Sequence, residues 1–380
     1  MADESFLGWP FFEPHHRALA ERLEQWCNAN LRHTHGADVD AECRALVAKL
    51  GEAGFLDLCI EREDTPPDVR SLAIARETLA RHSGLADFAF AMQGLGSGAI
   101  SLAGSPAQKA EWLPKVASGK AIAAFAMTEP DAGSDAANLG MTARDEGDAY
   151  ILDGEKTYIS NGGIADVYTV LARTGEAGSR GLSMFIVRAD DPGLTVAERI
   201  EVIAPHPLAR LKFDGVRGEL IGTPGEGFGI AMRTLTLFRV TVGAAALGFA
   251  RRALDEAISF STQRKLGNAT LADNGVTQAN LADMATAIDA SALLIARAAW
   301  QQDTQSGDNR RAAAMAKLHA TESAQAVIDA AVQLHGGLGV TRGVPVEALY
   351  RDIRALRIYE GASEVQRQII ARDLLKEHRT

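Results

Sequence analysis

Residues 357–366 read RIYEGASEVQ, and this stretch is the point from which the rest of the chain can be interpreted. Apolar residues recur at helical spacing after Ser363, so a helix is predicted to begin there. Ser363 and Gln366 have the spacing of a capping box, which supports that start. Glu360 is therefore predicted to lie in a tight loop just before a helix. The helix dipole would lower the pKa of such a carboxylate and an apolar ligand closing over it would raise it, which suits a general base, although a solvated turn has the same pattern.

The composition is that of a globular protein with two or three domains. The chain has 380 residues, of which 47% are hydrophobic and 23% charged. The net charge of -10 argues against nucleic acid or an anionic membrane as the main partner. The N-terminus lacks the pattern of a signal peptide, and no apolar run approaches a span of ~20 residues. Cys27, Cys43 and Cys59 are interpreted as reduced core thiols without a metal, in a cytoplasmic protein.

The pattern changes twice along the chain, which predicts a mostly α protein of the α+β class. Residues 1–121 are predicted to form a helical domain, 122–224 a central β domain, and 225–380 a four-helix bundle that carries Glu360. Turn signals separate the short strands at intervals typical of a sandwich or a barrel. Helices are predicted over residues 17–31, 41–50, 69–81, 88–102, 105–112, 228–264, 278–306, 310–334 and 345–357. Strands are predicted over 122–127, 141–144, 149–152, 156–160, 167–172, 182–187, 194–202 and 209–213.

Three glycines interrupt the apolar helix predicted over residues 88–102. Gly94, Gly96 and Gly98 are unfavourable in a helix, which suggests that something approaches it closely. Close contact with another helix and a ligand pocket explain this pattern about equally well. A pocket there would favour a bulky or branched acyl chain.

Several separated motifs together resemble one family. Residues 126–135 read AMTEPDAGSD, 156–163 read KTYISNGG and 333–337 read QLHGG, followed by YRD at 350–352 and IYEG at 358–361. In this order and spacing they resemble the signatures of the acyl-CoA dehydrogenase family, and the resemblance covers about residues 40–376. It implies an FAD-dependent dehydrogenase of acyl thioesters that assembles as a dimer of dimers. Electron-transfer flavoprotein is the electron acceptor that the resemblance implies.

The resemblance also implies which residues contact FAD. Small side chains, hydroxyls and accessible backbone N–H groups suit the polar edges of a flavin and its phosphates. Tyr158 stands where the family usually has Trp, and it still supplies an aromatic wall. The residues expected at FAD are Phe125, Met127, Thr128, Gly133, Ser134, Tyr158, Ile159, Ser160 and Arg264, with Gln333, Gly336 and Gly337 reaching the FAD of a neighbouring subunit.

By the same resemblance, Glu360 is expected to remove the α proton of the thioester while the flavin takes the β hydride. Some family members carry the base on the first long bundle helix, but the corresponding residue here is Phe238, which cannot accept a proton. Donors at the developing enolate oxygen do much of the work in such a reaction, and the Glu360 N–H is expected to be one. The residues expected at the substrate are Ser134, Arg239, Tyr359 and Gly361, and the alternative for Arg239 is an ordinary paired charge on a helix.

Several positions depart from the family pattern. Thr236 replaces an Asp that usually contacts the carrier arm, so an acyl group on a carrier protein stays an alternative to acyl-CoA. Residues that usually contact the outer half of FAD are replaced by Gln263, Gly275, Ala362 and Glu364. A flavin oxidase or monooxygenase on the same scaffold, a catalytically inactive family member, and a non-catalytic binding protein are the alternative functions.

Overall fold

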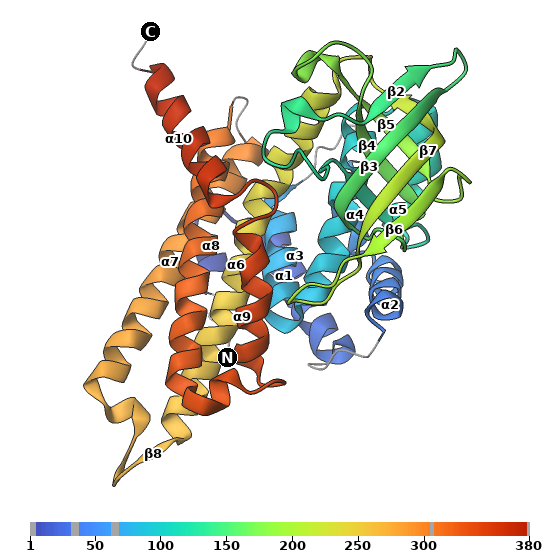
Figure 1. The fold of residues 1–380 in the computed structure, drawn as a ribbon. Helices are drawn as coiled ribbons and strands as arrows, with labels where there is room; N and C mark the ends of the chain where they lie inside the picture. The colour runs from blue at the N-terminus through green and yellow to red at the C-terminus, as the bar shows by residue number, and fades with distance from the viewer. Residues whose placement is uncertain (1–4, 32–37, 62–67, 305–307, 378–380) are drawn as a thin grey trace. The chain divides into compact units, whose positions relative to one another are not determined.

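The computed structural model describes residues 5–31, 38–61, 68–304 and 308–377. The order is the predicted one, with helices α1–α5 first, strands β1–β7 next and helices α6–α10 last (Figure 1). The described residues form two compact units. The bundle unit contains residues 5–31, 68–87, 239–304 and 308–377, and the barrel unit contains residues 38–61 and 88–238. Because both units are discontinuous in sequence, the domain boundaries at residues 121 and 224 stay predictions.

The N-terminal region is helical, as predicted. Its helices are α1 (Pro14–Asn30), α2 (Val39–Glu52), α3 (Val69–His82), α4 (Gly84–Ala103) and α5 (Pro106–Ala117), with short 3-10 turns at Ser5–Gly8 and Leu56–Cys59. Ser105 begins α5 by accepting the Gln108 N–H at 3.2 Å, while the Gln108 side chain accepts the Ser105 N–H at 2.9 Å. These reciprocal bonds satisfy two donors at the helix start, with Pro106 in the first turn.

The β region closes into a barrel. Its strands are β1 (Ala123–Ala126), β2 (Thr142–Asp145), β3 (Tyr150–Ser160), β4 (Val167–Arg173), β5 (Leu182–Arg188), β6 (Leu194–Arg199) and β7 (Leu208–Ile221). The pairings run β4–β2–β3–β7–β5 and return to β4, while β1 adds to β4 and β6 to β7. The separate strands predicted over 149–152 and 156–160 are wrong, because both belong to β3. A bulge at Gly154, with φ +147°, takes up the expected turn.

The three glycines of α4 allow close packing within the barrel unit. A Cβ atom at Gly94 would lie 2.5 Å from the Phe238 ring, and one at Gly98 would lie 2.7 Å from the Thr234 methyl group. A Cβ atom at Gly96 would lie 2.6 Å from the β1 backbone. Helix and strand contacts therefore occupy the space beside all three glycines, which favours close packing over a ligand pocket as the reason for them.

The C-terminal region consists of long helices, as predicted. They are α6 (Gly227–Gln263), α7 (Gly275–Thr304), α8 (Arg310–His335), α9 (Pro345–Leu356) and α10 (Ser363–Glu377), and Figure 1 shows α7 and α8 side by side. A small hairpin, β8 (Lys265–Leu266) with β9 (Ala269–Thr270), joins α6 to α7, and a 3-10 turn at Gly336–Val340 follows α8. By length and hydropathy alone α6 and α7 would also pass as membrane spans. The most apolar window is 78% buried inside the fold in α6 and 33% buried in α7.

Candidate active site

Glu360 lies on a strained turn between α9 and α10 in the bundle unit. Its φ is +52° and that of Gly361 is +92°, so two consecutive residues are left-handed. This conformation costs a Glu about 1–3 kcal/mol and persists only where the surroundings hold it. Lys317 Nζ and Gln366 Nε2 both donate to the Gly361 carbonyl oxygen, at 2.8 and 2.7 Å. The two donors fix the direction in which the turn presents Glu360.

The helix after the turn begins at Ser363, as predicted, but the predicted capping box is wrong. The Ser363 hydroxyl donates to a carboxylate oxygen of Glu322 on α8. The Gln366 side chain donates to the Gly361 carbonyl oxygen instead of accepting the Ser363 N–H. A charged acceptor forms the stronger hydrogen bond, so the tertiary contact displaces the local one.

The Glu360 carboxylate is held in an environment suited to a base. Its Oε2 is buried and has no hydrogen-bond partner among the residues that the structure describes. Burial raises the pKa of Glu360, and the nearby cations Arg76, Lys317 and Arg239 offset this only in part. The pKa is thus already raised by the protein itself, without a ligand closing over the site. A buried carboxylate with a raised pKa beside cations is typical of a general base.

A buried ion pair lies beside Glu360. Arg76 on α3 donates from Nε and Nη2 to the two carboxylate oxygens of Asp87 on α4, at 2.8 and 2.9 Å, and from Nη1 to the Thr241 hydroxyl at 3.1 Å. Tyr359 lies next to this pair, and burial raises the pKa of its hydroxyl well above the usual range. Tyr359 therefore stays neutral, and Arg76 stays charged.

Arg239 is not an ordinary paired surface charge. Its side chain is buried, and its Nε has no hydrogen-bond partner within the described part of the chain. Burial lowers the pKa of Arg239, while the charge of Glu360 acts in the opposite direction. The predicted site residues Arg239, Tyr359, Glu360 and Gly361 thus come together in the bundle unit.

Most residues expected at FAD gather on one part of the barrel unit, on β1, the loop after it and β3. Lys156 holds this loop by donating to the Met127 carbonyl oxygen at 2.9 Å and to Glu129 Oε1 at 2.8 Å. The Thr157 N–H donates to the Thr128 carbonyl oxygen at 2.9 Å. The loop is therefore tied to β3 at successive residues.

The exposed groups on this surface fit a flavin. The Tyr158 side chain is turned outward, with the residue 63% exposed and its φ at +54°. Ser134 is exposed, Gly133 has open space beside it, and Phe125, Met127, Thr128 and Ser160 are partly buried. The Ile159 side chain is buried, so it can offer only its backbone. An outward aromatic ring beside hydroxyls and a glycine suits a flat ring system with polar edges.

The remaining residues expected at FAD lie elsewhere in the bundle unit. Arg264, Gln333, Gly336 and Gly337 are all exposed. The rings of Phe260 and His335 stack with centroids 4.3 Å apart, which brings the ends of α6 and α8 together. Lys317 and Gln333 are 16 residues apart on α8, or about 24 Å at the usual helical rise. These residues do not join the Glu360 turn, and their role toward a neighbouring subunit stays a prediction.

A cluster of His15, His16 and Asp68 has the composition of a metal site, but its atoms are engaged in hydrogen bonds. His16 Nδ1 accepts the Glu13 N–H at 2.9 Å, so a neutral His16 carries its proton on Nε2, which donates to Asp68 at 3.1 Å. The same carboxylate accepts from the N–H and hydroxyl of Ser71 at the start of α3. The cluster therefore serves as a cap for α3.

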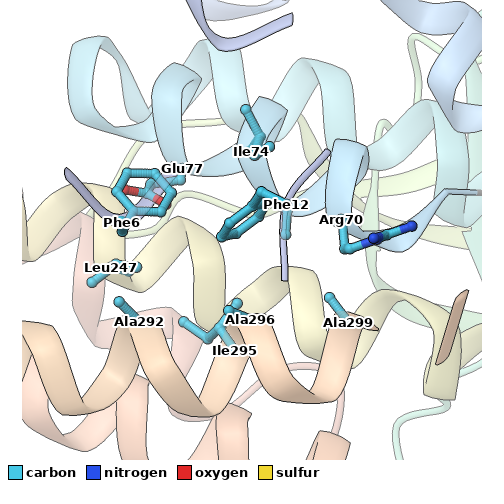
Figure 2. A pocket seen from close by; sticks show the side chains of 11 residues that line it. Phe6, Phe12, Arg70, Ile74, Glu77, Leu247, Ala292, Ile295, Ala296 and Ala299 are labelled. Atoms are coloured by element: carbon cyan, nitrogen blue, oxygen red, sulfur yellow. The ribbon is translucent and has the colours of Figure 1, made fainter. Parts of the chain in front are cut away.

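Figure 2 shows a small cavity in the bundle unit, bordered by Phe6, Phe12, Ile74 and the alanines of α7. Its volume is about 10 Å³, at the lower limit of what one water molecule requires. It is a packing gap and not a substrate site.

Sequence reasoning missed three residues that surround Glu360. Arg76 and Asp87 look like ordinary helix charges, and nothing in the sequence indicates that they pair. Lys317 did carry a signal, because it recurs at helical spacing with the buried residues Ala313, Ala320 and Thr321. A charged residue on an apolar helix face indicates a specific partner.

Comparison with known proteins gives a consistent answer. Family models of the acyl-CoA dehydrogenase N-terminal, middle and C-terminal domains match residues 13–120, 124–216 and 225–375. The chain is 36% identical to a 3-(aryl)acrylate reductase of Clostridium sporogenes, over 88% of this chain and 90% of the relative. It is 37% identical to a cyclohexane-1-carbonyl-CoA dehydrogenase of Geobacter metallireducens, over 80% and 82%. A glutaryl-CoA dehydrogenase of Mycobacterium smegmatis, solved in complex with FADH2, is similar with a TM-score of 0.87 at 28% identity, over 96% and 95%. The chain belongs to the acyl-CoA dehydrogenase family of FAD-dependent oxidoreductases that act on CH–CH groups.

Proposed function

We propose that the protein converts an acyl-CoA thioester to its trans-2-enoyl thioester, with Glu360 as the base that removes the α proton. The observation that supports this most strongly is the Glu360 carboxylate itself. One of its oxygens is buried without a hydrogen-bond partner among the described residues, on a turn held by two side-chain donors. A group in this state is free to accept a proton from a substrate.

The charges around Glu360 suit proton removal. Arg76, Lys317 and Arg239 favour the carboxylate form that can accept a proton, while burial makes the carboxylate more basic than an exposed one. As the α proton leaves, negative charge develops on the thioester carbonyl oxygen. The Glu360 N–H has no partner among the described residues, so it is available to donate to that oxygen.

FAD supplies the acceptor for the β hydride when it is bound. In this proposal the residues on β1, the loop after it and β3 hold FAD, with the ring of Tyr158 against the flavin and Ser134 also near the substrate. Lys156 and Glu129 contribute by fixing the loop, since both charges are buried and point away from solvent.

The finer features of the proposal follow from the family. They are CoA as the carrier, with a carrier protein as the alternative, electron-transfer flavoprotein as electron acceptor, and a dimer of dimers. The cytoplasmic location is proposed from the three cysteines, interpreted as reduced thiols. A flavin oxidase or monooxygenase stays the alternative reaction. The two relatives named above act on aryl and cyclic acyl groups by their descriptions, so such thioesters belong in any substrate panel.

The reverse reaction is a second candidate, because one relative is described as a reductase. Burial raises the pKa of Glu360, and a raised pKa favours the protonated carboxyl group that would return a proton to the α carbon in this direction. Flavin bleaching by acyl-CoA thioesters, compared with reoxidation of the reduced flavin by enoyl-CoA thioesters, distinguishes the preferred direction.

The test is Glu360→Gln, assayed by flavin bleaching without oxygen across a panel of acyl-CoA thioesters. Gln keeps the size and polarity but accepts no proton, so flavin reduction should slow by ~100- to 10,000-fold with FAD and substrate still bound. The matched control is Glu201→Gln, an exposed residue of the barrel unit, which should reduce flavin like the wild type. Wild-type reduction by Glu360→Gln would show that the base lies elsewhere.

A further inference from the structure

Lys317 is a buried cation that the proposed reaction does not use directly. It lies in the N-terminal third of α8, on the face that also buries Ala313, Ala320 and Thr321, and its side chain is fully buried. Among the described residues, its side chain donates one hydrogen bond, from Nζ to the Gly361 carbonyl oxygen at 2.8 Å. The bond therefore joins a long helix to the residue that follows Glu360.

The Lys317 ammonium lacks a close counter-ion. No carboxylate oxygen lies within 4.0 Å of its Nζ among the described residues, and Glu360 is the carboxylate whose charge most favours the protonated form of Lys317. The other charged groups that face it are Arg239 on α6, Glu322 on α8 and Glu364 on α10. Those that face Glu360 are Arg76, Asp87, Arg239, Lys317 and Tyr359. An unpaired buried cation is costly to the fold, so a purely structural helix position would favour an apolar residue.

We propose that Lys317 is a positioning residue for Glu360. Its ammonium group holds the Glu360 turn in place through the Gly361 carbonyl oxygen, and its positive charge balances the negative charge of the Glu360 carboxylate. This inference rests on the proposed function, because it gives Lys317 a role only if Glu360 is the base. Two effects are separable. The hydrogen bond fixes the left-handed turn and so the direction of the carboxylate, and the positive charge stabilises the carboxylate form that accepts the α proton.

Burial lowers the pKa of Lys317 to about 8, which still leaves it mainly protonated at neutral pH. Removing its charge should make Glu360 harder to deprotonate, because Lys317 is one of the cations that lower the pKa of Glu360. The acid limb of the pH–rate profile for flavin reduction should therefore move to higher pH. A residue that only fills space in α8 would leave that limb unchanged.

The experiment compares holoenzymes that carry Lys317→Met, Lys317→Arg and Lys376→Met, by stopped-flow flavin reduction with a saturating acyl-CoA that bleaches the wild type. Met keeps the length of the side chain without the charge. We expect ~10- to 100-fold slower reduction, as for a displaced catalytic group, and an acid limb at higher pH. Arg keeps the charge and should restore the wild-type acid limb. Lys376 is exposed on α10, and its replacement should change neither quantity.

A Lys317→Met enzyme with wild-type reduction rate and acid limb would overturn the proposal. So would a slower enzyme whose acid limb is unchanged and whose loss of rate only follows loss of bound FAD. Should Lys317→Met fail to fold, Lys317→Arg provides the test. An acid limb at the wild-type pH would support the proposal, and an acid limb moved to higher pH despite the retained charge would overturn it. The proposed base is tested separately: if Glu360→Gln is fully active, that assignment fails, whereas an inactive Glu360→Gln beside a wild-type Lys317→Met removes only the role of Lys317.

Discussion

The bundle unit and the barrel unit each bury one lysine beneath a turn or loop that is expected to act on the substrate or cofactor. Lys156 and Lys317 are both fully buried, and burial lowers the pKa of each to about 8. Each donates to a backbone carbonyl oxygen, of Met127 at 2.9 Å and of Gly361 at 2.8 Å. The difference lies in the counter-ion.

Lys156 is paired with a carboxylate that is itself satisfied. Glu129 accepts from Lys156 at 2.8 Å and from the N–H groups of Gly140 and Met141 at 2.6 and 3.1 Å. Lys317 has no such partner within 4.0 Å in the described ranges, and the carboxylate that most favours its charge is Glu360. An ion pair whose carboxylate is fully hydrogen-bonded holds its loop in one conformation. A carboxylate without a cation in direct contact can change its protonation state, which a base requires.

The largest expected difference between the two lysines is in stability. Lys156→Met leaves Glu129 buried without a cation, which costs about 3–5 kcal/mol, whereas Lys317→Met removes an unpaired charge and should cost much less. Urea unfolding of both variants at neutral pH measures this. Equal losses would mean that Lys317 is also part of a structural ion pair.

An effect on stability that both lysines share, because burial lowers the pKa of each to about 8, should appear at alkaline pH. Between about pH 8 and the ordinary lysine pKa of 10.5, unfolded chains keep the Lys317 proton and folded ones release it. The unfolded state then binds more protons, so this group makes the folded state more stable as pH rises through that window, by up to ~1.4 kcal/mol per pH unit. Lys317→Met lacks this pH-dependent gain in stability, so it should become less stable relative to the wild type between about pH 8 and 10. A constant difference in urea midpoint over that range would contradict the expectation.

A further prediction concerns FAD binding, which can be tested by restoring residues that are usual in the family. Ala362 and Glu364 replace residues that usually contact the outer half of FAD, and Glu364 is exposed. Ala362→Thr with Glu364→Gln should strengthen FAD binding by roughly tenfold, since a regained hydrogen bond contributes about 0.5–1.5 kcal/mol. The measurement is FAD retained after gel filtration of dilute protein, with the melting temperature followed as FAD is added. Stoichiometric FAD in the wild type at nanomolar concentration, unchanged by the double substitution, would mean that other contacts compensate.

The smallest expected effect isolates the hydrogen bond from the charge. Gln366→Leu removes the second donor to the Gly361 carbonyl oxygen and leaves every charge in place. Flavin reduction should slow only severalfold, as the loss of one neutral hydrogen bond of about 0.5–1.5 kcal/mol implies, and the acid limb should stay where it is. A limb that moves as far as in Lys317→Met would show that geometry, and not charge, sets the pKa of Glu360.

The sequence predicted the order of helices and strands and the start of α10 at Ser363, because hydrophobic spacing reports which face of each element is buried. It also predicted that Arg239, Tyr359, Glu360 and Gly361 belong together, although through family resemblance and not through spacing. The capping box failed because Glu322, 41 residues away, offers Ser363 a stronger acceptor than the local backbone does. The roles of the α4 glycines were left open for a similar reason, since only the positions of Phe238, Thr234 and β1 show what fills the space beside them.

What the sequence determined by itself is therefore local: the identity of the proposed base, the glycine after it that accommodates a left-handed turn, and the aromatic and hydroxyl groups expected at FAD. Tertiary structure alone decided the electrostatics of the site. Arg76, Asp87 and Lys317 lie far from Glu360 in sequence, and their charges act on it only because α3, α4 and α8 bring them near in the bundle unit. The pKa of a carboxylate depends on distance and burial in space, and neither quantity can be read from the order of residues along the chain.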